Sequence, residues 1–166
     1  TRYIGVTGVQ TCALPICPLK SNKSKLVAER FDWVQSVDRD KLIDRLNNQR
    51  PASMAPLNVC LQINISGESS KSGTSEQEIF RLAELVSHSE RLVLRGLMAI
   101  PEHTSDETVL AAQMTRMQTL FTELARQYPT VDTLSMGMTE DLELAIAHGS
   151  TMVRVGTAIF GARDYS

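Results

Sequence analysis

The segment whose residues are the strongest candidates for binding or catalysis lies near the end of the chain, at Met152–Gly161, which reads MVRVGTAIFG. In it a glycine and a hydroxyl residue, Gly156 and Thr157, follow an apolar run and open a predicted helical turn. Backbone N–H groups in the first turn of a helix lack partners inside that helix and attract anions. Because glycine also lets a ligand approach the backbone closely, the pattern predicts a phosphate-binding turn.

Two side chains extend this candidate site. Ser135 lies near the end of the preceding predicted strand, where its hydroxyl can donate a hydrogen bond to the same anion. Arg154 shares the polar face of the last predicted strand with Gly156. An ordinary buried strand followed by a tight turn has the same spacing, so the spacing alone leaves both interpretations open.

Other residues whose types could bind a ligand or catalyse a reaction are weaker candidates for a functional site. The loop Gly67–Gly73 reads GESSKSG and lacks the glycine-to-lysine spacing of a P-loop, so it is interpreted as a loop at the end of a strand. Cys12 and Cys17 lack a second pair of ligands, so no metal site is predicted there. The remaining ionisable candidates are interpreted as exposed or helix-end groups rather than catalysts: Glu140, Asp141, His88, His103 and His148.

The elements that must position these residues alternate between strand and helix from Pro18 onward. The predicted strands are Phe31–Val37, Leu57–Ser66, Leu92–Ile100, Thr133–Met138 and Met152–Val155. Amphipathic helices separate them, with predicted N-terminal caps at Asp38, at Ser75 with Glu78, and at Thr139. Gly149 occupies the position of a left-handed C-terminal cap.

Alternation of strands with helices predicts an α/β fold built from parallel βαβ units. The predicted strands carry polar residues on one face, among them Asn58, Gln62 and Ser135, whereas a central strand of a doubly wound sheet is apolar on both faces. A barrel of the (β/α)8 TIM type is therefore favoured over a doubly wound sheet, and the intervening helices argue against a solvated antiparallel sheet. Such a barrel needs about 250 residues, so we expect an incomplete barrel with about the last five β/α units.

Composition limits the classes of partner. The chain has 166 residues, 42% of them hydrophobic, and a net charge of −2, which predicts one soluble globular domain. The charge gives no electrostatic basis for nucleic-acid or membrane partners, and no run approaches the ~18 apolar residues of a membrane span. The sparse, odd set of three cysteines is typical of a reducing cytoplasm, where we expect the protein to be.

The first residues differ from the rest. Residues 1–17 carry no acidic residue and no amphipathic period, and the string VTGVQTCALPI resembles the translation of a sequencing adapter. We therefore expect residues 1–17 to be non-native and disordered, and residues 18–166 to be the C-terminal part of a barrel domain.

Several segments together resemble a known family. PLKSNKSKLVAE, PLNVCLQINIS with the following KSG, RGLMAIP, and TLSMGMTEDLELAIAHGSTMVRVGTAIFGARDYS resemble the pyridoxal phosphate homeostasis proteins, which are single-domain relatives of the alanine racemase barrel. The resemblance covers residues 18–166. It implies a fold-type III barrel that binds pyridoxal 5′-phosphate, with Arg154 facing the pyridine nitrogen, and with Ser135, Gly156 and Thr157 holding the phosphate.

The resemblance also implies a function. A permanent cation beside the pyridine nitrogen keeps that nitrogen unprotonated and makes the ring a poorer electron sink. The family is accordingly expected to bind, buffer and hand over the cofactor without robust catalytic turnover, with pyridoxal-phosphate-dependent apoenzymes as further partners and a monomer as the full-length state. The alternatives are a racemase or decarboxylase on the same barrel, and a sugar-phosphate barrel enzyme.

The sequence departs from the family pattern in two ways. Lys20 stands where the family has glutamine before Ser21. The imine-forming lysine of the family lies on the first barrel strand, and we expect that segment to be missing here. No lysine of this chain matches its motif, so no catalytic residue is predicted among Lys20, Lys23, Lys25, Lys41 and Lys71.

Overall fold

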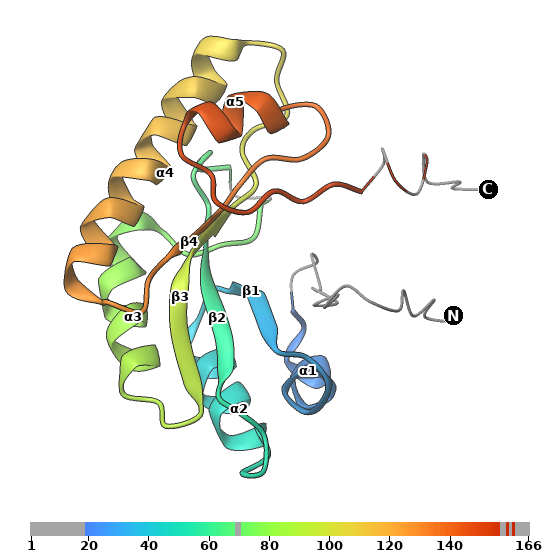
Figure 1. Cartoon of the computed structure of the whole chain (residues 1–166), viewed down its shortest axis with the longest axis vertical. Coiled ribbons are helices and arrows are strands. Elements are labelled where there is room, and N and C mark those ends of the chain that lie inside the picture. Colours follow the sequence, from blue (N-terminus) through green and yellow to red (C-terminus); the bar gives the residue numbers. More distant parts are fainter. Residues whose placement is uncertain (1–18, 69–70, 157–158, 160, 162–166) are drawn as a thin grey trace.

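The protein is represented by a computed structural model, which describes residues 19–68, 71–156, 159 and 161 (Figure 1). Thr157, Cys12, Cys17 and the predicted non-native segment 1–17 lie outside these residues. Among the helices of the described part of the chain, none combines the length and the apolar character needed to cross a membrane.

Four parallel strands form the sheet, in the order β1 (Trp33–Val37), β2 (Leu57–Ile63), β3 (Leu92–Ala99) and β4 (Thr133–Ser135). The sequence predicted all four strands, and the predicted ranges extend beyond the observed ones by up to three residues. Consecutive strands are neighbours in the sheet, so each helical connection returns the chain to the next position along one sheet. This confirms the predicted α/β class with parallel βαβ units.

The fifth predicted strand, Met152–Val155, is not formed as a strand. This segment makes one isolated parallel bridge, between Met152 and Ser135, and the Arg154 N–H then donates to the Gly137 carbonyl at 2.9 Å. Gly137 has a φ of +94°, which turns the backbone directly after β4. The two segments therefore lie side by side over only a few residues, which is too short for a regular ladder.

Helices separate the strands: α1 (Ser24–Arg30), α2 (Asp40–Gln49), α3 (Ile79–Ser87), α4 (Glu107–Gln127) and α5 (Leu142–Ala147), with 3₁₀ turns η1 (Ser21–Lys23) and η2 (Glu76–Glu78). Helices α3 and α4 cover one face of the sheet (Figure 1). They bury a stripe of apolar residues, for example Leu82 and Val86 of α3 and Met114 and Leu124 of α4.

The predicted N-terminal caps are wrong in three places. Asp38 pairs with its neighbour Arg39, and Arg39 occupies the cap position of α2. The remaining two helices begin later than predicted, because turns precede them. Ser75 occupies the N-cap position of the η2 turn but makes no side-chain capping bond, and α3 begins only after that turn. Asp141 rather than Thr139 occupies the N-cap position of α5. The predicted left-handed C-terminal cap at Gly149 is confirmed, with a φ of +83°.

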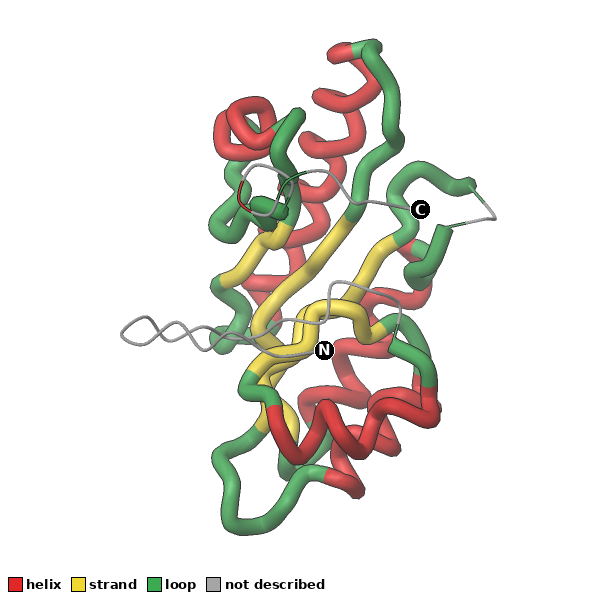
Figure 2. Tube along the Cα trace, turned by 90° about the vertical axis from the view of Figure 1, so that its right-hand side faces the viewer, coloured by secondary structure: helices red, strands yellow, loops and turns green. Residues whose placement is uncertain are grey.

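The sheet is strongly curled. Strands β1 and β4 are three strand spacings apart, which in a flat sheet separates them by about 14 Å. The Ser135 hydroxyl on β4 nevertheless donates to Oε1 of Gln35 on β1 at 2.7 Å. The strands therefore bend around a concave face, as Figure 2 shows from the side. This curvature is that of a barrel wall and not of a doubly wound sheet.

The two faces of the sheet differ in chemistry. On β2 the alternate residues Leu57, Val59, Leu61 and Ile63 are at most 1% exposed and belong to the hydrophobic core beneath the helices. The residues between them point to the concave face, where the sequence has asparagine, cysteine and glutamine. The concave face thus collects polar side chains, which the sequence predicted for β2 and β4 and not for β1 and β3.

Candidate functional site

The structure brings two predicted site residues into direct contact. Arg154, only 5% exposed, donates from Nη1 to the hydroxyl oxygen of Ser135 at 2.8 Å. Its Nη2 donates to the carbonyl oxygen of Ala99, at the end of β3, also at 2.8 Å. Ser135 is fully buried at the end of β4. The guanidinium therefore lies across the C-terminal ends of two neighbouring strands, where barrel sites are found.

The charge of Arg154 is unusual in its surroundings. Within the described residues, no carboxylate forms an ion pair with it, and its buried Nε has no hydrogen-bond partner. Burial lowers the pKa of Arg154, against the opposing influence of Asp141 and Cys60, but a guanidinium stays charged at any physiological pH. A buried cation with an unused donor is costly, so the site fits a ligand that accepts a hydrogen bond.

Gln35 completes the cluster, and the sequence analysis missed it. This β1 side chain is 2% exposed, its Oε1 accepts the Ser135 hydroxyl proton, and its Nε2 contacts the Met152 sulfur at 2.6 Å. A signal existed in the sequence, because a glutamine stands inside the strand segment WVQSV. Only the curl of the sheet, which sequence periodicity does not predict, shows that it meets Ser135.

The predicted phosphate turn is described only in part. Gly156 follows Arg154 by two residues, and its carbonyl accepts from the Ile159 N–H at 2.9 Å, so the chain turns there as expected. A Cβ added at Gly156 would meet no atom within 4 Å. This open space beside the backbone leaves room for a ligand. Thr157, the next predicted phosphate residue, lies outside the described residues.

A second polar cluster occupies the other end of the concave face. Arg95 donates from Nε to Asp132 at 3.1 Å and from Nη1 to the Asn58 side-chain oxygen at 2.9 Å. Its guanidinium also lies 4.6 Å from the centroid of the Trp33 ring. The hydrogen bond from Arg95 holds the pKa of Asp132 below its ordinary value. Each guanidinium nitrogen of Arg95 donates one hydrogen bond and its charge has a carboxylate partner, so this arginine has no unpartnered nitrogen to compare with the Arg154 Nε.

The loop after β2 is a strand-end loop, as predicted, and not a P-loop. Its carbonyls point inward and accept hydrogen bonds: Asn64 donates to the Glu68 oxygen at 2.8 Å and Gln62 to the Ser72 oxygen at 3.1 Å. Gly73 has a φ of +131°, and a Cβ there would lie 2.5 Å from the Asn64 nitrogen. The described residues of the loop, 67–68 and 71–73, are therefore fixed against β2 through their carbonyl groups.

The five lysines lie outside the Arg154 cluster. Lys71 in the loop after β2 ion-pairs with Glu68 and donates to the Pro101 oxygen at 3.2 Å, and the other four are exposed. The predicted exposure of His88 and His103 is confirmed, and His148 lies at the C-terminal end of α5 as expected.

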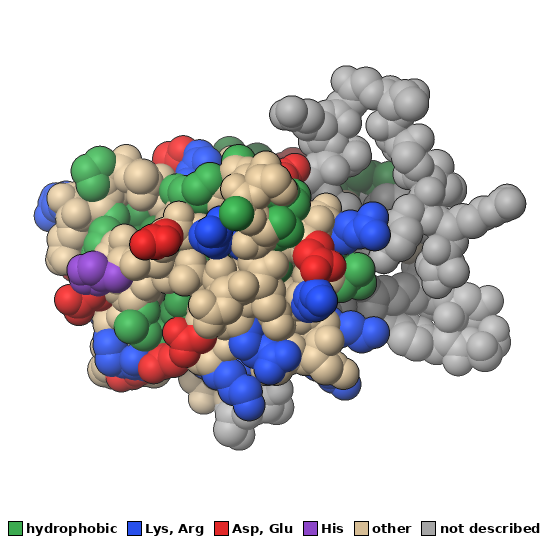
Figure 3. All heavy atoms as spheres, turned by 90° about the horizontal axis from the view of Figure 1, so that it is seen from below, with side chains coloured by type: hydrophobic (Ala, Val, Ile, Leu, Met, Phe, Trp, Pro, Cys, Tyr) green, Lys and Arg blue, Asp and Glu red, His purple; other side chains and the backbone are tan. Residues whose placement is uncertain are grey.

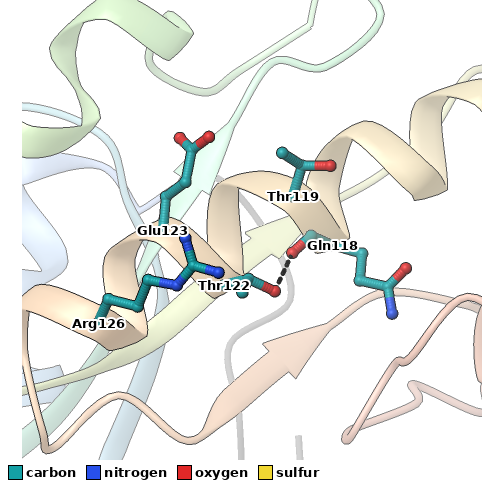
Figure 4. A pocket seen from close by; sticks show the side chains of 5 residues that line it. All are labelled: Gln118, Thr119, Thr122, Glu123 and Arg126. Atoms are coloured by element: carbon teal, nitrogen blue, oxygen red, sulfur yellow. Dashed lines mark hydrogen bonds between the residues drawn. The ribbon is translucent and has the colours of Figure 1, made fainter.

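One surface hollow lies away from the concave face, on α4. A shallow hollow on the outer side of α4 is lined only by exposed polar and charged side chains, and Thr122 donates there to the helix's own backbone, to the Gln118 oxygen at 2.8 Å (Figure 4). Basic and acidic side chains both occur on the surface seen in Figure 3, as expected from a net charge of −2.

Comparison with known proteins places this geometry in context. The family model described as "Alanine racemase, N-terminal domain" matches residues 10–164. A pyridoxal phosphate homeostasis protein of Vibrio alginolyticus is 56% identical over 151 residues, which are 91% of this chain and 65% of that protein. The protein of the same name from Escherichia coli K12 is 55% identical over 165 residues, 99% of this chain and 70% of the relative.

The chain is also similar to solved structures. PipY of Synechococcus elongatus, with pyridoxal phosphate bound, has a TM-score of 0.80 and 31% identity, covering 89% of this chain and 69% of that one. The chain thus spans about two thirds of the length of these relatives. The family match begins at residue 10, inside the segment predicted to be non-native, and the boundary at residue 17 stays a prediction.

Proposed function

The chain belongs to the alanine racemase N-terminal domain family, and within it to the pyridoxal phosphate homeostasis proteins; on that premise we propose that it binds pyridoxal 5′-phosphate and serves cofactor homeostasis. The observation that carries this proposal is Arg154, a buried cation that has, among the described residues, no paired carboxylate and no partner for its Nε donor. Such a group is best explained by a ligand that brings acceptor atoms into the concave face.

In this proposal, Arg154 binds the pyridine nitrogen, and the backbone at Gly156 and Thr157 holds the phosphate. Ser135, whose one hydroxyl proton goes to Gln35 Oε1, contributes by accepting a hydrogen bond from Arg154. The Arg154 Nε is a donor, so it fits an unprotonated ring nitrogen, which is an acceptor. The open space at Gly156 allows the phosphate to approach the backbone N–H groups. No role is assigned to the lysines, since all five lie outside this cluster.

The charge of Arg154 also bears on what the site does with its ligand. Pyridoxal phosphate, when bound, supplies a reactive aldehyde on an electron-withdrawing ring. Arg154 disfavours a proton on the ring nitrogen, because its own cation would lie against a second positive charge. The site is therefore better suited to holding and handing over the cofactor than to robust catalytic turnover.

The wider setting follows from the same proposal. We propose cytoplasmic apoenzymes that need pyridoxal phosphate as recipients, and a monomeric full-length protein. The racemase or decarboxylase alternative is not favoured, because the curated relatives above 50% identity carry the homeostasis name. The sugar-phosphate alternative has no observation in its favour. The following experiment distinguishes a sugar-phosphate site from a pyridoxal phosphate site.

Equilibrium dialysis of the whole 166-residue chain against pyridoxal 5′-phosphate tests the proposal. We expect saturable binding near one equivalent, competed by pyridoxine 5′-phosphate and not by ribose 5-phosphate or inorganic phosphate at the same concentration. Competition by ribose 5-phosphate would indicate a general sugar-phosphate site. No saturable uptake of pyridoxal 5′-phosphate would overturn the proposed function.

A further inference from the structure

Gln35 has no role in the proposed binding site, yet it is the buried polar side chain that links β1 to both Ser135 and Met152. It reaches across the concave face between strands that are not neighbours in the sheet. A glutamine at 2% exposure needs partners for its amide, and here it finds them in the two segments that carry the candidate site.

The hydroxyl proton of Ser135 determines the direction of the hydrogen bonds in this cluster. A serine hydroxyl has one proton and two lone pairs. Ser135 gives its proton to Gln35 Oε1 at 2.7 Å and accepts from Arg154 Nη1 at 2.8 Å. Its direction is therefore fixed: it accepts from the guanidinium, and it does not donate elsewhere while Gln35 holds its proton.

The identity of residue 35 matters for charge as well. Gln35 and Ala99 both offer neutral oxygens, one through Ser135 and the other directly to Arg154 Nη2. Two corners of the guanidinium are thus anchored without a carboxylate, so that among the described residues its positive charge has no ion-pair partner and its Nε has no acceptor. A glutamate at position 35 would supply the missing countercharge within the same cluster.

We propose that Gln35 is a positioning residue for the cofactor site: by holding the Ser135 proton, it orients Arg154 so that Nε faces the ligand. This inference rests on the proposed binding of pyridoxal phosphate at Arg154. It adds a residue that touches no ligand atom itself and acts through Ser135.

The matched test compares Gln35→Leu with Gln62→Leu. Gln62 is also buried, at 4% exposure, and lies on the next strand, but its amide donates to the Ser72 oxygen and not to Ser135. We expect Gln35→Leu to weaken pyridoxal phosphate binding about tenfold, which corresponds to one lost hydrogen bond in a buried site. Gln62→Leu should leave the affinity within about twofold of the unmodified chain.

A double-mutant cycle tests whether Gln35 acts through Ser135. If it does, Gln35→Leu, Ser135→Ala and the double variant each lose about tenfold in affinity, because each breaks the same chain of hydrogen bonds from Gln35 through Ser135 to Arg154. A double variant that loses about a hundredfold would show two independent contributions and would overturn the proposal. Equal losses in Gln35→Leu and Gln62→Leu would also overturn it, because general loosening of the fold would explain both.

A readout without cofactor keeps this inference separate from the proposed function. In ¹⁵N-edited NMR spectra of the whole chain, Arg154→Lys identifies the Arg154 Nε–H signal. We expect hydrogen exchange at that group to be at least about tenfold faster in Gln35→Leu than in Gln62→Leu, because the guanidinium loses its orientation. Unchanged exchange in Gln35→Leu would overturn the positioning role. Lack of cofactor binding by the unmodified chain would instead overturn the proposed function.

Discussion

Two arginines lie on the same concave face, and their surroundings are opposite. Arg95 is paired with Asp132, hydrogen-bonded to Asn58 and stacked over Trp33, and its side chain is 27% exposed. Arg154 is 5% exposed, and among the described residues its side chain has only a serine and a backbone carbonyl as partners. The more exposed arginine is the better satisfied one.

This difference separates a structural cluster from a candidate binding cluster. A folded chain that needed only stability would give a deeply buried cation a carboxylate, as Arg50, which is 3% exposed, has in Asp32. On the concave face the carboxylate instead accompanies the arginine at the N-terminal ends of the strands, and the arginine at the C-terminal ends pairs with no carboxylate of the described residues. In a barrel the C-terminal ends carry function and the N-terminal ends carry stability, and the two arginines follow that division.

The glycines near the two clusters give the largest expected effect. At Gly96, beside Arg95, φ is +153° and an added Cβ would lie 1.7 Å from the Thr133 carbonyl oxygen, whereas at Gly156 an added Cβ meets nothing within 4 Å. We expect Gly96→Ala to lower the free energy of unfolding by more than about 3 kcal/mol, measured by urea denaturation.

Gly156→Ala is the counterpart at the other cluster. Its unfolding free energy should stay within about 0.5 kcal/mol, because the methyl group meets open space. Its affinity for pyridoxal phosphate should fall about tenfold, because the methyl group occupies the path of the phosphate to the backbone. A Gly156→Ala chain that binds the cofactor normally would remove this turn from the proposed site.

Replacing each arginine by methionine gives the next effect. Arg154→Met should weaken pyridoxal phosphate binding by about 100-fold, which is about 2.7 kcal/mol, while changing the unfolding free energy by less than about 1 kcal/mol. Removing a buried charge that has no carboxylate relieves its desolvation cost, so the fold tolerates the change.

Arg95→Met should show the opposite pattern. We expect a loss of about 1–2 kcal/mol in unfolding free energy, because Asp132 and Asn58 lose their partner, and an affinity within about threefold of the unmodified chain. Calorimetric titration and denaturation of both variants measure the two quantities. Equal losses of affinity in the two variants would show that the clusters do not divide stability from binding.

The fold could be predicted from sequence to the extent that it depends on local pattern. Leu57, Val59, Leu61 and Ile63 alternate with polar residues, so β2 and its two-faced character were predicted correctly. Helix starts failed because the pattern cannot show competing partners: Asp38, for example, pairs with Arg39 instead of capping α2.

The site was predicted only where its residues are close in sequence or share a motif. Ser135 and Arg154 belong to adjacent segments, and the structure joins them. Gln35 lies 100 residues from Ser135, and Asp132 lies 37 residues from Arg95. Such contacts depend on how tightly the sheet curls, which is a property of many strands together and leaves no mark in any single segment.

The smallest expected effect is the response to acid, which again should differ between the clusters. The hydrogen bond from Arg95 lowers the pKa of Asp132 in the folded chain. Its stabilising contribution is therefore present above the unfolded-state pKa of about 3.9 and is lost as pH falls through the lower folded-state value. Asp132 is 54% exposed, so solvent screening limits this contribution to less than about 1 kcal/mol.

Asp132→Asn isolates this contribution. The difference in unfolding free energy between the unmodified chain and Asp132→Asn should be largest near pH 7 and should shrink below about pH 4. The corresponding difference for Arg154→Met should vary much less with pH, because no carboxylate of the described residues forms an ion pair with that guanidinium and Asp141 acts on it without one. A pH dependence for Arg154→Met as large as that for Asp132→Asn would show that an acid pairs with the guanidinium, and the contrast between the two arginines would then fail.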